Sequence, residues 1–324
     1  MNWVSQVKYM ILLLVFSTQL RGQEDTKYLF YCNESLEIET IWPLSRSNFV
    51  AHIAPESKRP RSGEQFLLFN RSRLVTDTLI AEGGIFNHFV VLDQGEFIIT
   101  TTLKTHLYKV VDDKFELISS TKNPSGLATL MSSDFSDYPI GEFLGFELGY
   151  ESSAKDRTKK RSKKNIPRYY YKVNGQKEWV NSGKEEVAGD QWESFMDKTF
   201  LLLGDVTQFK ESVYFNIPMA GRCYILNAQS KKVKTLLYPS EGAKSWYLTI
   251  DRVKGSHYLV GQTKDKVFKI YHVNLETGKR TYLKDVTHFY DMIIDDKVLI
   301  KKEVKEGKKK FNCFYLKPLY GEFD

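Results

Sequence analysis

Short apolar runs recur along most of the chain, and they come in pairs joined by tight polar turns. The stretch YHVNLETGKRTYL (271–283) has an apolar run, a turn built from Asn274, Thr277 and Gly278, and a return run in which apolar and polar residues alternate. Alternation with a period of two predicts a β-strand, and two such runs around a Gly-containing turn predict a hairpin. A lone hairpin cannot bury its faces in water, so this one needs partners.

The same hairpin recurs elsewhere. GRCYILNAQSKKVKTLLYP (221–239) has an aromatic-rich run ending in Asn227, a polar turn and a Lys-containing return run. RYYYKVNGQKEWVNSG (168–183) turns at Asn174-Gly175, which is the strongest short hairpin signal. Weaker copies are THLYKVVDDKFELISS (105–120) and QFLLFNRSRLVTDTLIAE (65–82), while FNCFYLKPLYGEF (311–323) keeps little beyond the first strand.

Each copy follows another pair of strand-like runs, so the predicted unit is four antiparallel strands in sequence order. The third strand of five units ends at an Asn or Asp, namely Asn70, Asp112, Asn174, Asn227 and Asn274. These positions lie 42, 62, 53 and 47 residues apart. Four-stranded meanders at such a spacing are the sequence signature of a β-propeller, in which neighbouring blades cover the faces that one blade leaves exposed.

The predicted fold is therefore all-β, with six four-stranded blades. Six third strands are found, near Phe69, Tyr108, Tyr171, Ile225, Tyr271 and Phe314. The last unit has three clear strands, and KYLFYCNESLEIETIWPL (27–44) precedes the first full unit. A strand from this N-terminal segment would complete the sixth blade and close the ring, which removes an exposed edge. Seven blades stay open if the segment supplies more than one closing strand.

The stretch FKESVYFNIPMAGRCYILNAQSKKVKTL (209–236) resembles the secreted six-bladed β-propeller proteins of Bacteroidota. In it, a strand ending in a short Pro-containing turn precedes an aromatic-rich strand, an Asn turn and a Lys-rich return, and the cadence recurs around Tyr271. The family is largely uncharacterised. The resemblance implies an exported, ring-shaped scaffold for binding, and the chain departs from the family pattern in lacking Gly-rich links between blades.

The N-terminus predicts export. Lys8 precedes an apolar run from Tyr9 to Phe16, which is too short to span a membrane, and small or polar residues follow it. We expect a signal peptide at 1–22, and a single propeller domain at 23–324 that is monomeric and secreted, periplasmic or held in the cell envelope. Without residues 1–22 the formal charge falls from +7 to +5, because Lys8 and Arg21 are lost; such a balance is too weak to indicate nucleic acid.

The three cysteines are too few for a disulfide framework. Cys32 and Cys313 lie in strand-like runs near opposite ends of the chain, so a bond between them is open if those ends meet. The alternative is that both are small buried hydrophobes.

No catalytic motif accompanies the repeat. The chain has no Gly-x-Ser-x-Gly elbow and no paired metal-ligand histidines, so we expect neither a cofactor nor a metal. Histidines inside strand runs are expected to be structural. Carboxylate pairs occur at Asp134 and Asp137 and at Asp295-Asp296, where a turn and a hairpin tip are the simpler interpretations.

The most unusual segment is a basic insertion at about 150–167, between the second and third strands of one blade. Its candidate anion-binding residues are Lys155, Arg157, Lys159, Lys160, Arg161, Lys163 and Lys164. Such a run is either a solvated loop or a patch for a polyanion. Taken together, the sequence favours a binding scaffold for a protein, peptide or glycan, and the alternative is a hydrolase or lyase whose active-site residues converge at the central funnel.

Overall fold

A computed structural model describes most of the chain as strands. The described residues are 29–33, 38–53, 64–70, 72, 74–84, 86–92, 95–101, 103–122, 138–151, 168–179, 205–217, 221–240, 242–306 and 309–320. Within them, all 24 regular elements are strands, arranged as six four-stranded antiparallel sheets. No helix in this part of the chain could cross a bilayer. The predicted signal peptide lies outside the described residues.

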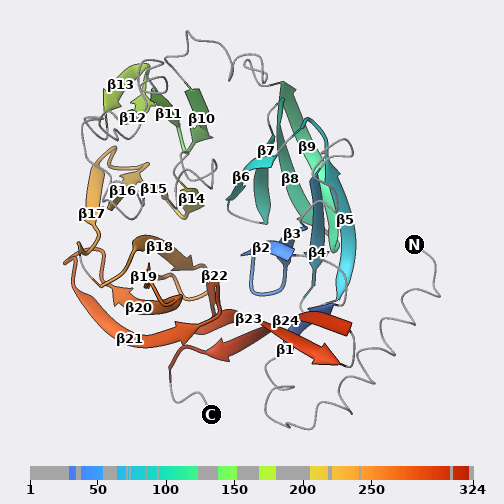
Figure 1. Ribbon diagram of the computed structural model, residues 1–324. Coiled ribbons are helices and arrows are strands. Elements are labelled where there is room, and N and C mark those ends of the chain that lie inside the picture. The colour runs from blue at the N-terminus through green and yellow to red at the C-terminus, as the bar shows by residue number, and fades with distance from the viewer. Residues whose placement is uncertain are drawn as a thin grey trace, which may run out of the picture.

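The six sheets are the blades of a propeller, set around a common centre (Figure 1). Blade 1 comprises β2 (Ile38–Pro43), β3 (Phe49–Ile53), β4 (Glu64–Phe69) and β5 (Val75–Ala81). Blade 2 comprises β6 (Phe86–Val91), β7 (Glu96–Thr101), β8 (Lys104–Val111) and β9 (Lys114–Lys122). Blade 3 comprises β10 (Tyr138–Phe143), β11 (Phe146–Glu151), β12 (Arg168–Val173) and β13 (Gln176–Trp179).

The remaining blades follow in the same order. Blade 4 comprises β14 (Asp205–Phe209), β15 (Ser212–Ile217), β16 (Arg222–Asn227) and β17 (Val233–Leu237). Blade 5 comprises β18 (Ser245–Asp251), β19 (Ser256–Gln262), β20 (Val267–Val273) and β21 (Arg280–Thr287). Blade 6 comprises β22 (Phe289–Ile294), β23 (Lys297–Glu306), β24 (Lys309–Pro318) and the N-terminal β1 (Leu29–Asn33). The predicted six-bladed propeller is confirmed.

The turns follow the predicted chemistry. Asn174 and Gly175 both have positive φ, as do Asp112 and Asp113, and each pair joins two strands of a hairpin. Two consecutive residues with positive φ match the right-handed twist of the strands that they connect. The side chain of Asn274 accepts hydrogen bonds from two backbone N–H groups of its own turn, at 2.9 Å each. Local residue choice therefore determines where the strands reverse.

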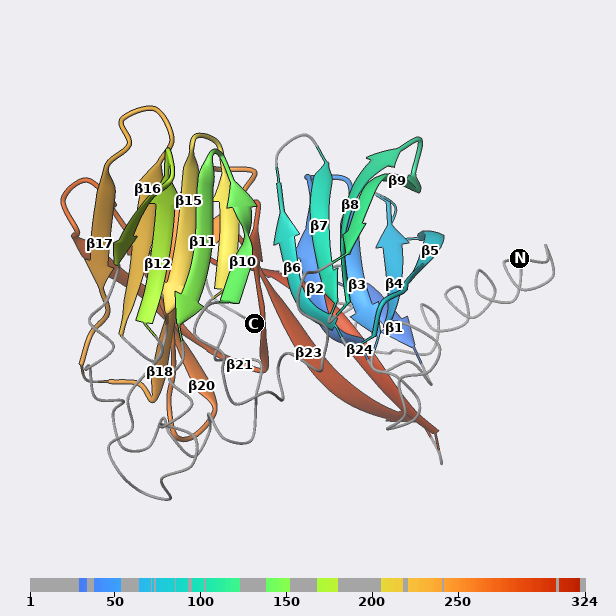
Figure 2. The ribbon, with the colours of Figure 1, turned by 90° about the horizontal axis from the view of Figure 1, so that it is seen from above.

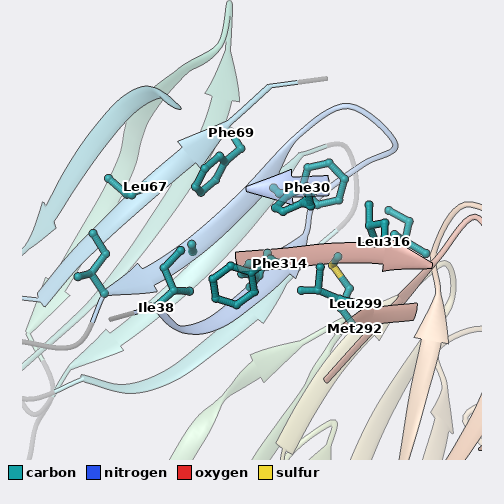
Figure 3. Packing of buried hydrophobic residues seen from close by; sticks show 13 residues of the cluster. Phe30, Ile38, Leu67, Phe69, Met292, Leu299, Phe314 and Leu316 are labelled. Carbon is teal, nitrogen blue, oxygen red and sulfur yellow. The ribbon is translucent and has the colours of Figure 1, made fainter. Parts of the chain in front are cut away.

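Closure of the ring depends on β1, which pairs with β24 at the outer edge of blade 6. Phe30 of β1 packs in one apolar cluster with Ile38 of blade 1 and Phe314 of blade 6 (Figure 3). Cys32 lies opposite Cys313 in this pairing, and a disulfide joins them across 281 residues of chain. The N-terminal strand therefore closes the ring, as predicted. Formation of the disulfide in the protein in solution stays a prediction.

Buried side chains fill the spaces between neighbouring blades. One cluster links blades 4 and 5 through residues such as Tyr214 and Trp246, and another, which contains Phe146, links blades 2, 3 and 4. In line with this three-blade cluster, the innermost strands β6 and β14 lie against each other. The outermost strands are more open to solvent: on β9, every residue from Glu116 to Lys122 is exposed.

Polar side chains also cross between blades. Asn216 of blade 4 is 1% exposed; its amide donates to the Leu248 carbonyl of blade 5 at 3.1 Å and accepts from the Leu248 N–H at 3.1 Å. The fully buried Asp251 of blade 5 accepts from the Asp296 N–H of blade 6 at 2.9 Å. These side chains provide hydrogen-bond partners for backbone groups that no strand of the next blade pairs, so the buried backbone between blades stays hydrogen-bonded.

The antiparallel order gives the ring two distinct faces. We call the face at which the innermost strands begin the starting face, and the face at which they end the far face. The connections between second and third strands, and those from one blade to the next, join strand ends that lie at the starting face. The strands stand between the two faces when the ring is seen from the side (Figure 2). The strand ends that flank the predicted basic insertion, the end of β11 and the start of β12, lie at the starting face.

Candidate functional site

Three side chains of blade 1 meet at the starting face, where the His52 imidazole lies between two carboxylates and is hydrogen-bonded to one of them, Glu64. His52 Nδ1 lies 3.1 Å from Glu39 Oε2, and His52 Nε2 lies 3.0 Å from Glu64 Oε2. The side chains of His52 and Glu64 are 4% and 6% exposed, whereas that of Glu39 is 50% exposed. A buried carboxylate and a solvent-exposed carboxylate are thus connected through one imidazole, and we call this group the Glu–His–Glu chain.

The strand ends place these residues together. Glu39 is the second residue of β2, His52 is the last but one of β3, and Glu64 is the first of β4. The register of β2 against β3 shifts between Ile38 and Thr40, so Glu39 is the extra residue of a β-bulge opposite His52. A bulge re-aims the side chain that it carries, and bulges are enriched next to active sites. Without this shift, strict alternation would turn residue 39 away from His52.

Blade 2 contacts Glu64, at the buried end of the Glu–His–Glu chain. Glu64 Oε1 accepts a hydrogen bond from the Phe86 N–H at 3.1 Å, and the rings of Phe66 and Phe86 lie 5.0 Å and 4.7 Å from that of His52. The hydrogen bond from His52 holds the pKa of the Glu64 carboxyl below its ordinary value, against the opposing effect of burial. The imidazole is therefore fixed in place by two aromatic rings and an ionised carboxylate.

At the far face, Arg252, which belongs to the turn between β18 and β19, links three blades. Its guanidinium donates to the carbonyls of Val91 at 2.7 Å and Leu92 at 3.3 Å, at the end of β6. It also donates to the Gln208 carbonyl of β14 and lies 5.7 Å from the centroid of the Phe209 ring. One side chain of blade 5 thus bonds the backbones of blades 2 and 4.

A second histidine is bonded between blades 4 and 5, towards the far face. His257 Nε2 and the Tyr214 hydroxyl share a hydrogen bond of 2.9 Å. Burial, assisted by the neighbouring His272 and Lys210, lowers the pKa of His257 to about 4, and burial raises the pKa of Tyr214 to about 12. Both groups are therefore neutral at pH 7, which suits a structural link better than exchange of protons with a ligand.

The residues singled out from the sequence do not join these groups. The seven basic residues of the insertion lie outside the described residues, as do Asp134 and Asp137. Asp295 and Asp296 form a turn with positive φ at the far face, as predicted; Arg46 donates to Asp295 at 2.9 Å and holds the pKa of that carboxyl below its ordinary value. In the described part of the chain, no three His, Cys, Asp or Glu residues are grouped so as to hold a metal ion.

Sequence reasoning missed Glu39, Glu64 and Arg252. His52 was visible as a polar residue within an apolar run, but nothing local identifies its partners. Glu64 lies 12 residues from His52, and Arg252 lies 160 residues from Leu92. A shift in strand register and the closure of the ring bring these groups together, and neither leaves a local pattern in the sequence.

No protein family matches the sequence, and no curated protein is found to be related to it. Solved structures with a similar fold include TolB from Acinetobacter baumannii, at 11% identity and a TM-score of 0.42, with 83% of this chain and 63% of that chain covered. A luciferin-regenerating enzyme matches at 9% identity and a TM-score of 0.44, covering 88% and 92% of the two chains. An oligogalacturonate lyase in complex with manganese matches at 10% identity and 0.44, covering 89% and 90%.

This chain spans less than two thirds of the TolB chain that it matches. Because the sequence identities are near 10%, the functions of these proteins are not transferred to this chain. The propeller architecture of this protein rests on the strand pairing of its six blades.

Proposed function

We propose that the protein is an exported binding scaffold, which holds a protein, peptide or glycan on its starting face. The observation that carries this proposal is the difference between the two faces. Short hairpin turns join the strands at the far face, where Arg252 also bonds the backbones of β6 and β14. The longest connections between strands, 123–137, 152–167 and 180–204, all join strand ends at the starting face, so we place recognition there. Propellers commonly present binding surfaces in this way.

The basic insertion supports a polyanion as part of that ligand. It holds seven Lys or Arg residues and one Asp between Lys155 and Lys164. It leaves the ring from the end of β11 and returns at the start of β12, and both of these strand ends belong to the starting face. Clustered cations attract an anionic polymer over a distance set by the ionic strength.

A polyanion-binding assay tests this role. All seven basic residues of the insertion are changed to Ser or Gln, and binding to immobilised heparin is measured over a range of salt concentrations. We expect the variant to elute at clearly lower salt than the parent protein, with its melting temperature unchanged. The matched comparison removes three positive charges from each region: Lys159, Lys160 and Arg161 of the insertion in one variant, and Lys231, Lys232 and Lys279, which are exposed in far-face turns, in the other. Equal losses in the two variants would show only a response to net charge and would contradict the role.

The alternative is a funnel-centred hydrolase or lyase. It requires acid and base groups from separate blades to converge at the centre. On the innermost strands, the exposed carboxylates of described side chains are Glu39, near the starting face, and Glu142, towards the far end of β10. These two groups lie at opposite faces of the ring and do not form an acid/base pair; the side chains of Asp205 and Asp291, on β14 and β22, lie outside the described ones.

A further inference from the structure

We infer that blade 3 opens as a unit while the other five blades stay closed as a ring. In the open state, strands β10 to β13 leave their apolar contact with blades 2 and 4 and unfold. This conformational device is built into the described strands and needs no ligand. It therefore goes beyond the proposed binding function and does not depend on it.

The ring is closed without blade 3. The innermost strands of the two blades that flank it, β6 of blade 2 and β14 of blade 4, lie against each other, and neither lies against β10 of blade 3 to the same extent (Figure 1). Arg252 of blade 5 donates to the carbonyls of Val91 and Gln208, near the ends of these two strands. The departure of blade 3 would leave this direct contact between its neighbours in place.

Each of the other five blades has a strand that lies against a strand of another blade. β2 meets β22, β22 meets β18, β18 meets β15 and β16, and β5 meets β9. Among the described residues, no strand of blade 3 approaches another blade to this extent. Blade 3 is therefore the blade with the least backbone packing against its neighbours.

Hydrogen bonds from polar side chains also link the other neighbouring blades. They join blade 1 to blade 2, blade 4 to blade 5, blade 5 to blade 6 and blade 6 to blade 1, through Glu64, Asn216, Asp251 and Tyr290 respectively. Each of these bonds must break before the blades that it joins can separate, and a buried polar group that loses its partner is costly.

Blade 3 is attached through one apolar cluster. Phe146 and Leu148 are fully buried, and they pack in this cluster with Val90 of blade 2 and Phe215 of blade 4. Lys231 of blade 4 lies 5.1 Å from the centroid of the Phe146 ring. Because these contacts form a single cluster, they are lost together when the blade leaves the ring.

The connections on both sides of blade 3 do not hold it against the ring by their length. Residues 123–137 join it to blade 2 and residues 180–204 join it to blade 4, whereas residue 288 alone joins blade 5 to blade 6. An extended chain covers about 3.3 Å per residue, so even the shorter of the two connections can span roughly 50 Å. Blade 3 can thus separate without pulling on its neighbours.

A blade that leaves the ring cannot keep its strands paired. Its apolar side chains would face water, and its outermost strand, β13, has four residues, three of which are exposed even in the closed ring. A small sheet needs a packed apolar face to be stable. The opening is therefore a local unfolding, which requires less free energy than unfolding of the whole protein.

Thiol labelling of the folded full chain tests the opening. Leu148, Leu259 and Leu299 lie on the second strands of blades 3, 5 and 6, and each is fully buried. Each is replaced by Cys in a separate variant, and the rate of alkylation is measured by mass spectrometry. We expect L148C to react at least about 100-fold faster than L259C and L299C. Equal rates in the three variants would overturn the inference.

The buried free thiol of Cys223 in blade 4 is an internal control in every variant. It should stay slow to react. If Cys223 reacts as fast as the new thiol of L148C, the ring opens as a whole and blade 3 is not a separate unit.

Hydrogen exchange of the parent protein gives the same test without a substitution. The amides of β11 and β12 are hydrogen-bonded within blade 3, as those of β19 and β20 are within blade 5. We expect the blade 3 amides to exchange at least about 100-fold faster. Their opening should also depend less on denaturant than global unfolding does, because less surface is exposed. Equal protection of the two blades would refute separate opening and would leave the test of polyanion binding unaffected.

Discussion

At the residue scale, the contact between Gly261 and Trp246 shows how tightly blade 5 is packed. The two residues are direct partners on β19 and β18, and a Cβ atom added to Gly261 would lie 2.3 Å from the Trp246 ring. The indole covers the glycine, and both are buried. We expect G261A to lower the free energy of unfolding by at least about 2 kcal/mol, because an overpacked core must shift its side chains. Denaturant unfolding measures this change.

The double variant provides the control. Phe in place of Trp246 removes ring atoms that the new methyl group would meet, so G261A should be less costly in W246F than in the parent protein. Additive effects of the two substitutions would contradict direct contact between them.

The lowered pKa of His257 makes the stability of the protein depend on pH. That pKa is about 4 in the folded protein and near 6.5 in the unfolded chain. Between these values the unfolded state binds more protons, so stability should fall as pH decreases from about 6.5 to 4, by about 2–3 kcal/mol from this group. Urea unfolding at pH 7 and at pH 4.5 should show a smaller difference in H257Q than in the parent protein. Replacement of the exposed His288 by Asn should leave that difference unchanged.

At the element scale, single polar side chains hold neighbouring blades together. Asn216 satisfies both backbone groups of Leu248 and accepts a hydrogen bond from the Tyr238 hydroxyl. We expect N216A to destabilise the protein by about 2–4 kcal/mol, because buried backbone groups would lose their partners. Chemical denaturation measures the loss. N227A removes a side chain that bonds only within its own turn, and it should cost about 1 kcal/mol or less. A loss of equal size in both variants would contradict a special role for the link between blades.

At the scale of the whole molecule, the two ends of the chain hold the ring closed. β1 covers the edge of β24, and the Cys32–Cys313 disulfide links them across 281 residues. We expect the double change C32S/C313S to lower stability by about 2–5 kcal/mol, because the disulfide restricts the unfolded chain over a long loop. Mass spectrometry of the unreduced protein tests the bond, and thermal unfolding tests its effect.

Removal of residues up to Asn33 should be more severe. It exposes the edge of β24 and uncovers the apolar cluster around Phe314, so we expect a lower melting temperature together with aggregation. A truncated protein that melts like the full chain would refute the closing role of β1.

The four-stranded unit and the order of its strands could be predicted from the sequence, because they depend on local patterns. Six blades closed by an N-terminal strand followed from counting these units, and the structure excluded the seventh blade that the count left open. Alternation predicts each strand, and residue pairs such as Asn174-Gly175 and Asp112-Asp113 predict where the chain reverses. The location of the protein, its monomeric state and its place in a bacterial family stay predictions. Local patterns could not assign the polar centres, because their members are brought together by strand register and by the packing of blades.

The repeated strand pattern is enough to specify the architecture, since four-stranded units that cannot bury their own faces have to stack around a closed ring. Which polar groups meet depends on the folded structure. A bulge one residue long turns Glu39 towards His52, and the approach of β6 to β14 places their backbones within reach of Arg252. Both depend on distances between segments remote in the chain. A periodic pattern does not encode such distances, because it specifies the face on which a residue lies and not the group that it faces.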